Sequence, residues 1–231
     1  MRSRFLKSGQ RKKINRSINH FMSILQQYGI PTIFFLLFCA SHSLFAHKSF
    51  KERVFDVAPK LKPFYRLLYN ILAGLLLLLW LITLPNERVI YQTEGTWMIV
   101  MIGIQILAAF AALKSLKGHG SVFMGLTQLR RYLNHGEHPE YLDEPKRGRL
   151  IRSGFYSYIR HPLYTFSIVI LAATPIMTQN LVYIIVCVGL YFYIGSFFEE
   201  RGLIKRFGDD YRIYQKEVPR FIPNLFHIID R

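Results

Sequence analysis

Five long apolar runs constrain this sequence more than any other feature. Each is close to the roughly 17 to 25 residues that cross about 30 Å of hydrocarbon as an α-helix. A soluble helical bundle would need polar faces at a 3.6-residue period, and Leu72–Leu84 has almost none. The sequence therefore predicts an all-α, polytopic integral membrane protein with about five transmembrane helices. The runs are Ile30–Ala46, Phe64–Leu84, Trp97–Leu113, Leu163–Met177 and Leu181–Phe198.

The charge balance also fits a membrane protein. Lys and Arg number 30 against 14 Asp and Glu, a surplus that would suggest a nucleic acid partner in a soluble protein. Here the basic residues crowd the links between apolar runs, where they hold loops in the cytoplasm and meet anionic headgroups. We therefore expect membrane lipids as partners and no nucleic acid. Cys39 and Cys187 lie inside apolar runs and indicate neither a disulfide framework nor a thiolate metal site.

Alternation of five spans puts two long basic links, 48–66 and 114–161, and the C-terminal tail on one side, which the positive-inside rule makes cytoplasmic. The N-terminal tail, residues 1–17, conflicts with this arrangement. Its seven basic and no acidic residues indicate a disordered, headgroup-binding segment, yet five spans would place it outside. Either the first run does not cross fully or one link is mis-assigned, and the sequence leaves both open. Residues 18–147 then form an N-terminal transmembrane region with three spans, and residues 148–231 a C-terminal region with two.

Charged residues gather where the last two spans meet the cytoplasmic side. These spans are separated by only Thr178-Gln179-Asn180, which predicts a tight antiparallel hairpin. His161 at the start of one span and Glu199 at the end of the other would then lie at the same depth. Charges beside a span are costly unless they face protein, cofactor or water. Arg160, His161, Glu199 and Glu200 therefore indicate either interfacial anchors or a binding site, and the residues alone favour neither.

The motifs between Gly148 and Pro223 follow one another in a specific order. They are Gly154-x-Tyr156, His161-Pro162-x-Tyr164, the hairpin, Glu199-Glu200-x-x-Leu203, Phe207-Gly208-x-x-Tyr211-x-x-Tyr214 and Val218-Pro219. This order resembles the isoprenylcysteine carboxyl methyltransferase family of membrane enzymes. The resemblance implies a site for S-adenosylmethionine that forms without a Rossmann domain, and the chain indeed has no strand followed by Gly-x-Gly-x-x-Gly.

Carried over position by position, the resemblance implies nine cofactor-binding residues. Backbone N–H groups at the start of the fourth span would bind the donor's carboxylate, and Pro162 suits that first helical turn. Glu199 would accept from ribose hydroxyls or offset the sulfonium charge. The nine residues are Gly148, Leu150, Ile151, Tyr156, His161, Pro162, Leu163, Tyr164 and Glu199.

One departure from the family's motif narrows the chemical class of the methyl acceptor. Carboxyl methyltransferases carry an arginine associated with the prenylcysteine four residues before the cofactor glutamate, and here that position is Gly195. A site without this cation is less suited to a carboxylate. Thr174–Thr178 and Gly125-Leu126-x-Gln128 are similar to the methanethiol S-methyltransferase branch, and Ser41-His42-Ser43-Leu44 resembles both that branch and the nurim-like proteins.

The leading hypothesis is a membrane enzyme that transfers a methyl group from S-adenosylmethionine to a small thiol such as methanethiol. The alternatives are methylation of a prenylcysteine carboxylate or a lipid amine, and a non-catalytic nurim-like membrane protein. We predict no general base, because a thiolate is already nucleophilic, and His42 is an acceptor-side candidate that also has an ordinary structural interpretation. His135-Gly-Glu-His138 lies in a loop without further clustered ligands, so we expect no metal.

Overall fold

The computed structural model describes residues 8–86, 88–116, 124–136 and 150–223. Within this part of the chain, four helices are long and apolar enough to cross a membrane, which confirms the prediction of an all-α polytopic membrane protein. They are α1 (Ser8–Ala46), α3 (Tyr65–Ile82), α4 (Gly95–Ser115) and α8 (Gln179–Phe207). A fifth apolar helix, α7 (Pro162–Ala172), is shorter.

The chain divides into two compact units, each described here by itself. The first, residues 1–57 and 68–86, holds α1, α2 (Lys48–Val57) and most of α3. Helices α1 and α3 pack through aromatic rings, with Phe35 and Trp80 centroids 4.6 Å apart. Interpreting residues 1–17 as disordered is wrong from Ser8 onward, where α1 begins. Extending a helix that a long apolar run has already nucleated costs little per residue, so α1 continues into the basic segment.

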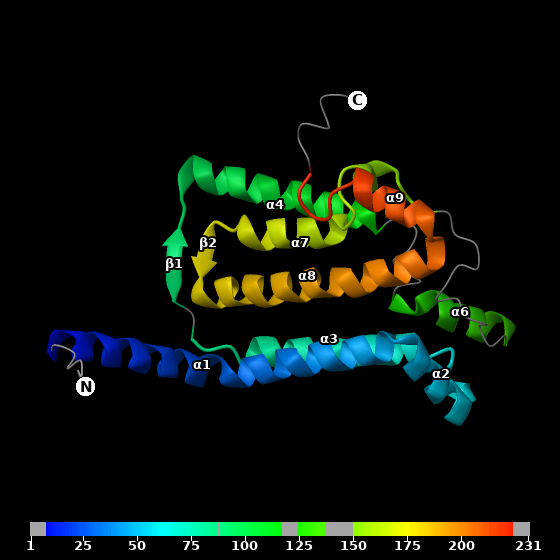
Figure 1. Ribbon diagram of the computed structural model, residues 1–231, viewed down its shortest axis with the longest axis horizontal. Helices are drawn as coiled ribbons and strands as arrows, with labels where there is room; N and C mark the ends of the chain where they lie inside the picture. Colours follow the sequence, from blue (N-terminus) through cyan, green and yellow to red (C-terminus); the bar gives the residue numbers. More distant parts are fainter. Residues whose placement is uncertain (1–7, 87, 117–123, 137–149, 224–231) are drawn as a thin grey trace, which may run out of the picture. The chain divides into compact units, whose positions relative to one another are not determined.

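The second unit, residues 58–67 and 87–231, contains the predicted site. Besides α4, α7 and α8 it includes short elements: η1 (Pro59–Leu61), β1 (Val89–Gln92), α6 (Leu126–His135), η2 (Gly154–Ser157), β2 (Ile176–Thr178) and α9 (Asp209–Glu217). Helix α7 lies between α4 and α8 (Figure 1). The buried face of α4 carries Ala108, Ala111 and Ala112, and small residues let apolar helices approach closely. Gln105 Nε2 of α4 donates to the Ile170 carbonyl of α7 at 2.9 Å.

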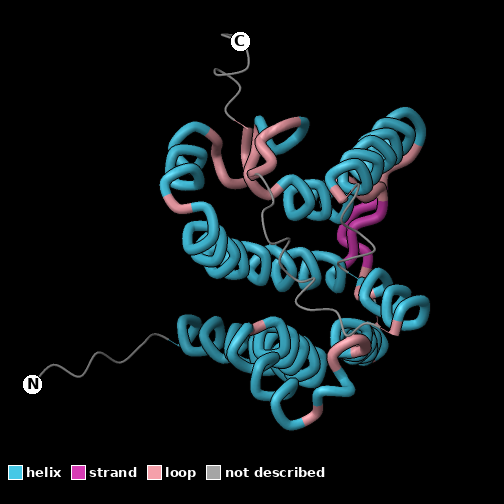
Figure 2. Tube along the Cα trace, turned by 90° about the vertical axis from the view of Figure 1, so that its right-hand side faces the viewer, coloured by secondary structure: helices cyan, strands magenta, loops and turns pink. Residues whose placement is uncertain are grey.

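The prediction of a helix over Leu163–Met177 is wrong at its C-terminal end, because α7 ends at Ala172. Strand β2 follows and pairs antiparallel with β1, with Val89 opposite Thr178 (Figure 2). Pro175 disfavours the helical conformation of the residue before it, which helps to end α7. The turn between α7 and α8 is therefore a strand held by a distant partner and not a three-residue loop.

Backbone and capping bonds fix this turn at both ends. Thr93 N donates to the Pro175 carbonyl at 2.8 Å, and Gln179 N donates to the Arg88 carbonyl at 2.9 Å. The side chain of Thr178 then caps α8, accepting from Leu181 N at 3.1 Å. The antiparallel course of α7 and α8 is retained, so the start of α7 and the end of α8 lie close together.

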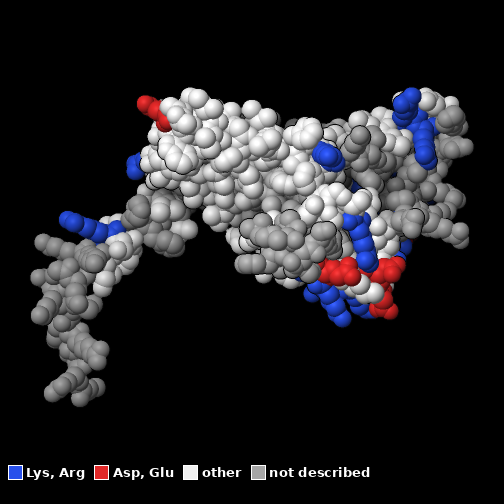
Figure 3. Space-filling view, turned by 90° about the horizontal axis from the view of Figure 1, so that it is seen from above, with Lys and Arg blue, Asp and Glu red and all other residues white. Residues whose placement is uncertain are grey.

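Charged side chains of the second unit are distributed unevenly along its length. Figure 3 shows a broad surface free of charged side chains over α4, with acidic and basic groups gathered at the end where α9 lies. The apolar surface suits contact with lipid acyl chains, and the charged end suits the headgroup region. The predicted site lies at this charged end.

Candidate active site

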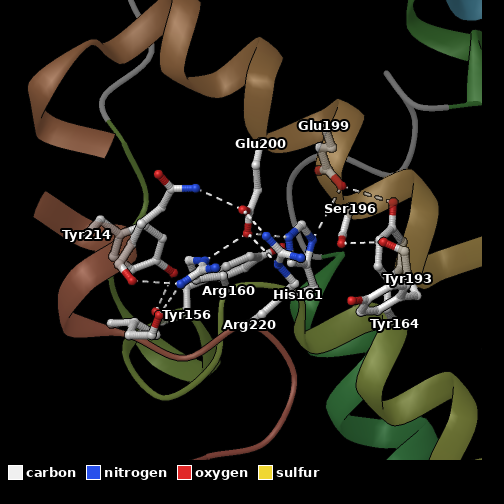
Figure 4. A network of polar contacts seen from close by, with 12 residues as sticks. Tyr156, Arg160, His161, Tyr164, Tyr193, Ser196, Glu199, Glu200, Tyr214 and Arg220 are labelled. Carbon is white, nitrogen blue, oxygen red and sulfur yellow. Dashed lines mark hydrogen bonds and ion pairs between the residues drawn. The ribbon is translucent and has the colours of Figure 1, made fainter. Parts of the chain in front are cut away.

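His161 and the two glutamates meet at one depth, as the hairpin predicts. His161 precedes α7, and its Nε2 atom lies 3.1 Å from Glu200 Oε1. Its Nδ1 atom lies 3.4 Å from Glu199 Oε2. One imidazole therefore bridges two adjacent carboxylates of α8 (Figure 4).

Glu200 is the centre of a buried ionic network. Its residue is 2% exposed, and a carboxylate at such a position needs charged or hydrogen-bonding partners. Arg160 Nε donates to Oε1 at 2.8 Å, while Gln215 Nε2 donates to Oε2 at 2.8 Å. Arg220 reaches both oxygens, at 3.3 Å from Nε and 2.8 Å from Nη2. We call Glu200, Arg160, His161, Gln215 and Arg220 the Glu200 network.

This network holds a C-terminal strap, residues 218–222, against the start of α7. Arg160 Nη1 also donates to the carbonyls of Gln215 and Val218. Three consecutive strap carbonyls accept bonds from the same region: Pro219 from Arg160 N (2.9 Å), Arg220 from His161 N (3.1 Å) and Phe221 from Thr165 Oγ1 (2.9 Å). The strap is thus fixed by its backbone as well as by its arginine.

Glu199 differs from Glu200 because its side chain is 48% exposed. Its Oε2 accepts a bond from Tyr164 Oη at 2.9 Å, and among the described residues its Oε1 has no partner. The Tyr164 ring stacks on His161 with centroids 5.2 Å apart and on Phe192 with centroids 4.3 Å apart. An open carboxylate therefore lies beside a continuous stack of three aromatic rings.

Charge and burial shift the protonation of groups at this end. Burial of His161 opposes its protonation, but hydrogen bonds and charges from Glu199 and Glu200 outweigh it and raise the pKa of the imidazole. Burial raises the pKa of Tyr214 to about 12. Tyr214 therefore stays a neutral donor, and its Oη donates to the Tyr156 carbonyl at 2.6 Å.

Comparison with known proteins decides the family. Residues 95–210 match the family model described as phospholipid methyltransferase. The chain belongs to this family. The matched range contains α4, α7, α8, His161 and both glutamates, and ends before the strap.

Several curated relatives carry the name methanethiol S-methyltransferase. One from Bradyrhizobium diazoefficiens is 30% identical, over 84% of this chain and 66% of its own length. One from Pseudomonas deceptionensis is 27% identical, over 85% and 72%, and one from Mycobacterium tuberculosis is 28% identical, over 91% and 84%. This chain thus spans about two thirds of the length of the first relative. No solved structure matches it significantly.

The phospholipid methyltransferase match agrees with the resemblance inferred from the motifs, but it does not assign individual site residues. The structure brings His161, Tyr164 and Glu199 together. Pro162 is fully buried at the first turn of α7, and Leu163 beside it is half-buried. The contacts among His161, Tyr164 and Glu199 thus connect the start of α7 with the exposed carboxylate.

The predicted residues before α7 are less tightly grouped. Gly148 lies outside the described residues. Leu150 packs against a core cluster of Tyr211, Tyr214 and Val218, while Ile151 is exposed. Tyr156 is half-buried, and burial followed by the charge of Glu199 raises the pKa of its hydroxyl. The negative charge of Glu199 therefore reaches this segment.

Sequence reasoning missed the role of the Glu200 network. Arg160 and Glu200 were singled out as costly charges, but their partners Gln215 and Arg220 were not. The sequence does carry one signal for the network. Arg160 and Arg220 flank the last two spans, and a single exposed glutamate would not need two arginines. Arg220 lies 20 residues after Glu200 in the chain, so no local sequence pattern indicates that the two side chains pair.

The acceptor-side residues lie in different surroundings. Around Gly195, one turn before Glu199, a Cβ atom would meet no described atom within 4 Å, so the backbone there is open where the carboxyl methyltransferases that the motifs resemble carry an arginine. His42 belongs to the first unit, where its ring stacks on Phe38 at 5.4 Å and meets the Tyr69 ring edge at 5.5 Å. These aromatic contacts agree with a structural role for His42.

Proposed function

We propose that this protein transfers a methyl group from S-adenosylmethionine to a small thiol such as methanethiol. The observation that carries the proposal is the open carboxylate of Glu199 beside the rings of His161 and Tyr164, at the charged end of a membrane bundle. Relatives named methanethiol S-methyltransferase align with more than four fifths of the chain. Family membership and site chemistry thus favour the same reaction class.

The residues present fit the methyl donor chemically. Glu199 has an oxygen available for ribose hydroxyls or for the positive sulfonium, while the Tyr164 ring, stacked between His161 and Phe192, holds that carboxylate in place through its hydroxyl. The N–H groups of Leu163 and Tyr164 open the first turn of α7 and favour an anion such as the donor's carboxylate. When bound, the donor supplies a methyl group that the acceptor sulfur takes as it loses its proton, and S-adenosylhomocysteine is the second product.

The charges at the site favour a thiol over a carboxylate acceptor. Arg160 and Arg220 are both committed to Glu200. Gly195 itself, at the position of the arginine in the carboxyl methyltransferases that the motifs resemble, supplies no cation in their place. A carboxylate brought here would lose its hydration without gaining a charged partner, whereas a thiol loses little. The chain's remaining task is to position the acceptor sulfur in line with the methyl group and exclude water.

Donor binding tests the site directly. Purified protein in detergent should bind S-adenosylhomocysteine, and Glu199→Gln should weaken binding about 10- to 100-fold through loss of charged hydrogen bonds. His161→Ala should weaken it as well. Glu217→Gln is the matched control, because Glu217 lies half-exposed on α9 and pairs only loosely with Arg152 at 3.5 Å. Unchanged binding in both site variants would overturn the assignment of these residues.

Substrate profiling distinguishes among the three candidate methyl acceptors. Labelled methyl transfer to methanethiol yields a volatile methyl sulfide, which gas chromatography detects. The family description makes a lipid amine the other acceptor to assay, and a prenylcysteine carboxylate is the third. Methylation of either one, with none of the thiol, would contradict the proposal. The excess of basic residues at the site's end supports placing it on the cytoplasmic side.

A further inference from the structure

An apolar cavity of about 290 Å³ adjoins the proposed site in the second unit. It lies between α7 and α8, and the strap residues Phe221 and Ile222 complete its wall. Tyr164 belongs both to this wall and to the aromatic stack beside Glu199. The cavity therefore adjoins, through Tyr164, the place where methyl transfer would occur.

We propose that this cavity binds the hydrocarbon part of the methyl acceptor, so that the enzyme takes apolar thiols larger than methanethiol. The inference rests on the proposed function and specifies its substrate class. A volume of about 290 Å³ lies near the lower end of the roughly 300 to 1,000 Å³ found for pockets of drug-sized ligands. Methanethiol, with one carbon and one sulfur, leaves most of this space unfilled.

The lining excludes a charged or strongly polar acceptor. Among the described residues that line the cavity, none is Asp, Glu, Lys, Arg or His. The hydroxyl of Thr165 donates to the Phe221 carbonyl, and the hydroxyl of Tyr164 donates to Glu199. A carboxylate in the cavity would find these two donors already used, and no carboxylate among the described lining residues would pair with an ammonium, so the desolvation of either group would be poorly compensated. An alkyl or aryl group meets no such penalty.

The cavity also has an apolar entrance. Tyr193 of α8 is 53% exposed and Ile222 of the strap is 81% exposed, and both line it. Figure 4 shows Tyr164 and Tyr193 on the same side of Glu199. A thiol dissolved in the bilayer would pass these residues with its chain remaining in apolar surroundings. Its sulfur, as the polar end, would then lie toward Tyr164 and Glu199.

Gly189 controls the size of the cavity. It lies on α8, and a Cβ atom there would lie 3.9 Å from Ile168 Cδ1 of α7, in ordinary contact. A leucine at this position would fill space that a substrate chain otherwise takes. Gly103 on α4 is the matched control, because a Cβ atom there meets nothing within 4 Å and the residue is not part of the lining.

The test measures kcat/KM for methanethiol, ethanethiol, butanethiol and hexanethiol with labelled methyl donor. For the wild type we expect a rise of about fourfold per added methylene until the cavity is filled, which is the usual effect of burying a methylene. Gly189→Leu should lower the ratio of hexanethiol to methanethiol activity by about tenfold or more. Gly103→Leu should leave that ratio unchanged. Ile168→Ala should extend the rise to longer chains.

The outcomes separate this inference from the proposed function. Methylation of methanethiol with no rise along the series, or an equal loss for all thiols in Gly189→Leu, overturns the inference and leaves thiol methylation intact. No methylation of any thiol by protein that binds S-adenosylhomocysteine overturns the proposed function itself. If Gly189→Leu loses that binding through misfolding, Gly189→Ala should show a smaller shift in the same direction, and its absence would also overturn the inference.

Discussion

Glu199 and Glu200 are adjacent residues of α8 whose side chains lie in different surroundings. Successive residues of an α-helix point about 100° apart, so only one of two neighbours faces a given partner. Glu200 faces α9 and the strap, where its side chain is 3% exposed, while that of Glu199 is 48% exposed. Both carboxylate oxygens of Glu200 are therefore bonded within the network, whereas the carboxylate of Glu199 is available for a ligand.

Removing the charge of Glu200 should destabilise the protein strongly. Glu200→Gln leaves Arg160 and the partly buried Arg220 without their carboxylate, and breaking such a pair at a buried position typically costs about 3–5 kcal/mol. Thermal unfolding of the protein in detergent should therefore show a much lower midpoint. Glu199→Gln is the control, because its exposed side chain contributes little to folding. Similar midpoints for the two variants would contradict the different roles assigned here.

The contribution of His161 to stability should depend on pH. Its pKa is raised in the folded protein, so folding favours the protonated imidazole between two carboxylates. This stabilisation is fully present below the ordinary histidine pKa of about 6.5 and is lost as pH rises through the raised pKa. The difference in melting temperature between wild type and His161→Gln should therefore shrink from about pH 6 to about pH 9. A constant or growing difference would show that the charged pairing does not stabilise the fold.

The hairpin formed by α7 and α8 shows what the sequence predicts about elements. Run length and the short separation predicted two antiparallel helices, with His161 and Glu199 at one depth, and the contact between them confirms this. The end of α7 was misjudged because apolar residues continue to Met177 while the helix stops at Ala172. The reason is pairing of β2 with β1, and strand pairs so distant in sequence leave no local pattern.

Gly125 should be required for the start of α6. Its φ is +84°, and a Cβ atom would lie 2.8 Å from the backbone nitrogen of Leu67. Gly125→Ala should cost about 1–2 kcal/mol from the left-handed backbone and about 1–3 kcal/mol more from overpacking. Gly136→Ala is the matched control, because its φ is +61° and nothing lies within 4 Å. Thermal unfolding should show the larger loss for Gly125→Ala, and equal losses would mean that the contact with Leu67 is unimportant.

At the scale of the whole molecule, the second unit contains three antiparallel segments, namely α4, α7 with the strand that follows it, and α8, and we predict that each of them crosses the membrane. From Gln179 to Glu200, α8 rises about 31 Å at about 1.5 Å per residue. Helix α7 covers about 16 Å of the same depth, and the six residues after it add up to about 20 Å when extended. Helix α4 runs alongside, with Thr93 bonded to Pro175 at one end and Tyr156 Oη near the Ser115 carbonyl at the other.

Length and hydropathy were therefore enough to predict long apolar helices, because the bilayer sets both. The packing partners were not predictable in the same way. Side chains that satisfy each other across the bundle, such as Gln105 with the Ile170 carbonyl, depend on which helices become neighbours. An apolar helix with little amphipathic pattern does not reveal which face it buries. For the site, the motif order gave a prediction that periodicity could not, but it did not predict the Glu200 network.

Three crossings place the two ends of the second unit on opposite sides of the membrane. The β1 end carries Arg88 and Glu94, which nearly balance, whereas the α8 end carries Arg201, Lys205 and Arg206. The positive-inside rule then makes Lys205 cytoplasmic and Glu94 external. In a background with Cys39 and Cys187 replaced by alanine, a membrane-impermeant maleimide should label Glu94→Cys in intact cells. It should label Lys205→Cys only after permeabilisation.

This labelling tests the number of crossings separately from their direction. Both positions are exposed, so failure to react reflects the membrane and not burial. If both cysteines were labelled from outside, an even number of crossings would separate the two positions. In that case α7 and the strand after it would not cross the membrane together. The reverse pattern, Lys205→Cys alone in intact cells, would keep three crossings but place the donor site outside. Under the proposed function, soluble S-adenosylmethionine would reach Glu199 from the same side as Lys205, so donor binding to sealed inverted vesicles should agree with the maleimide result.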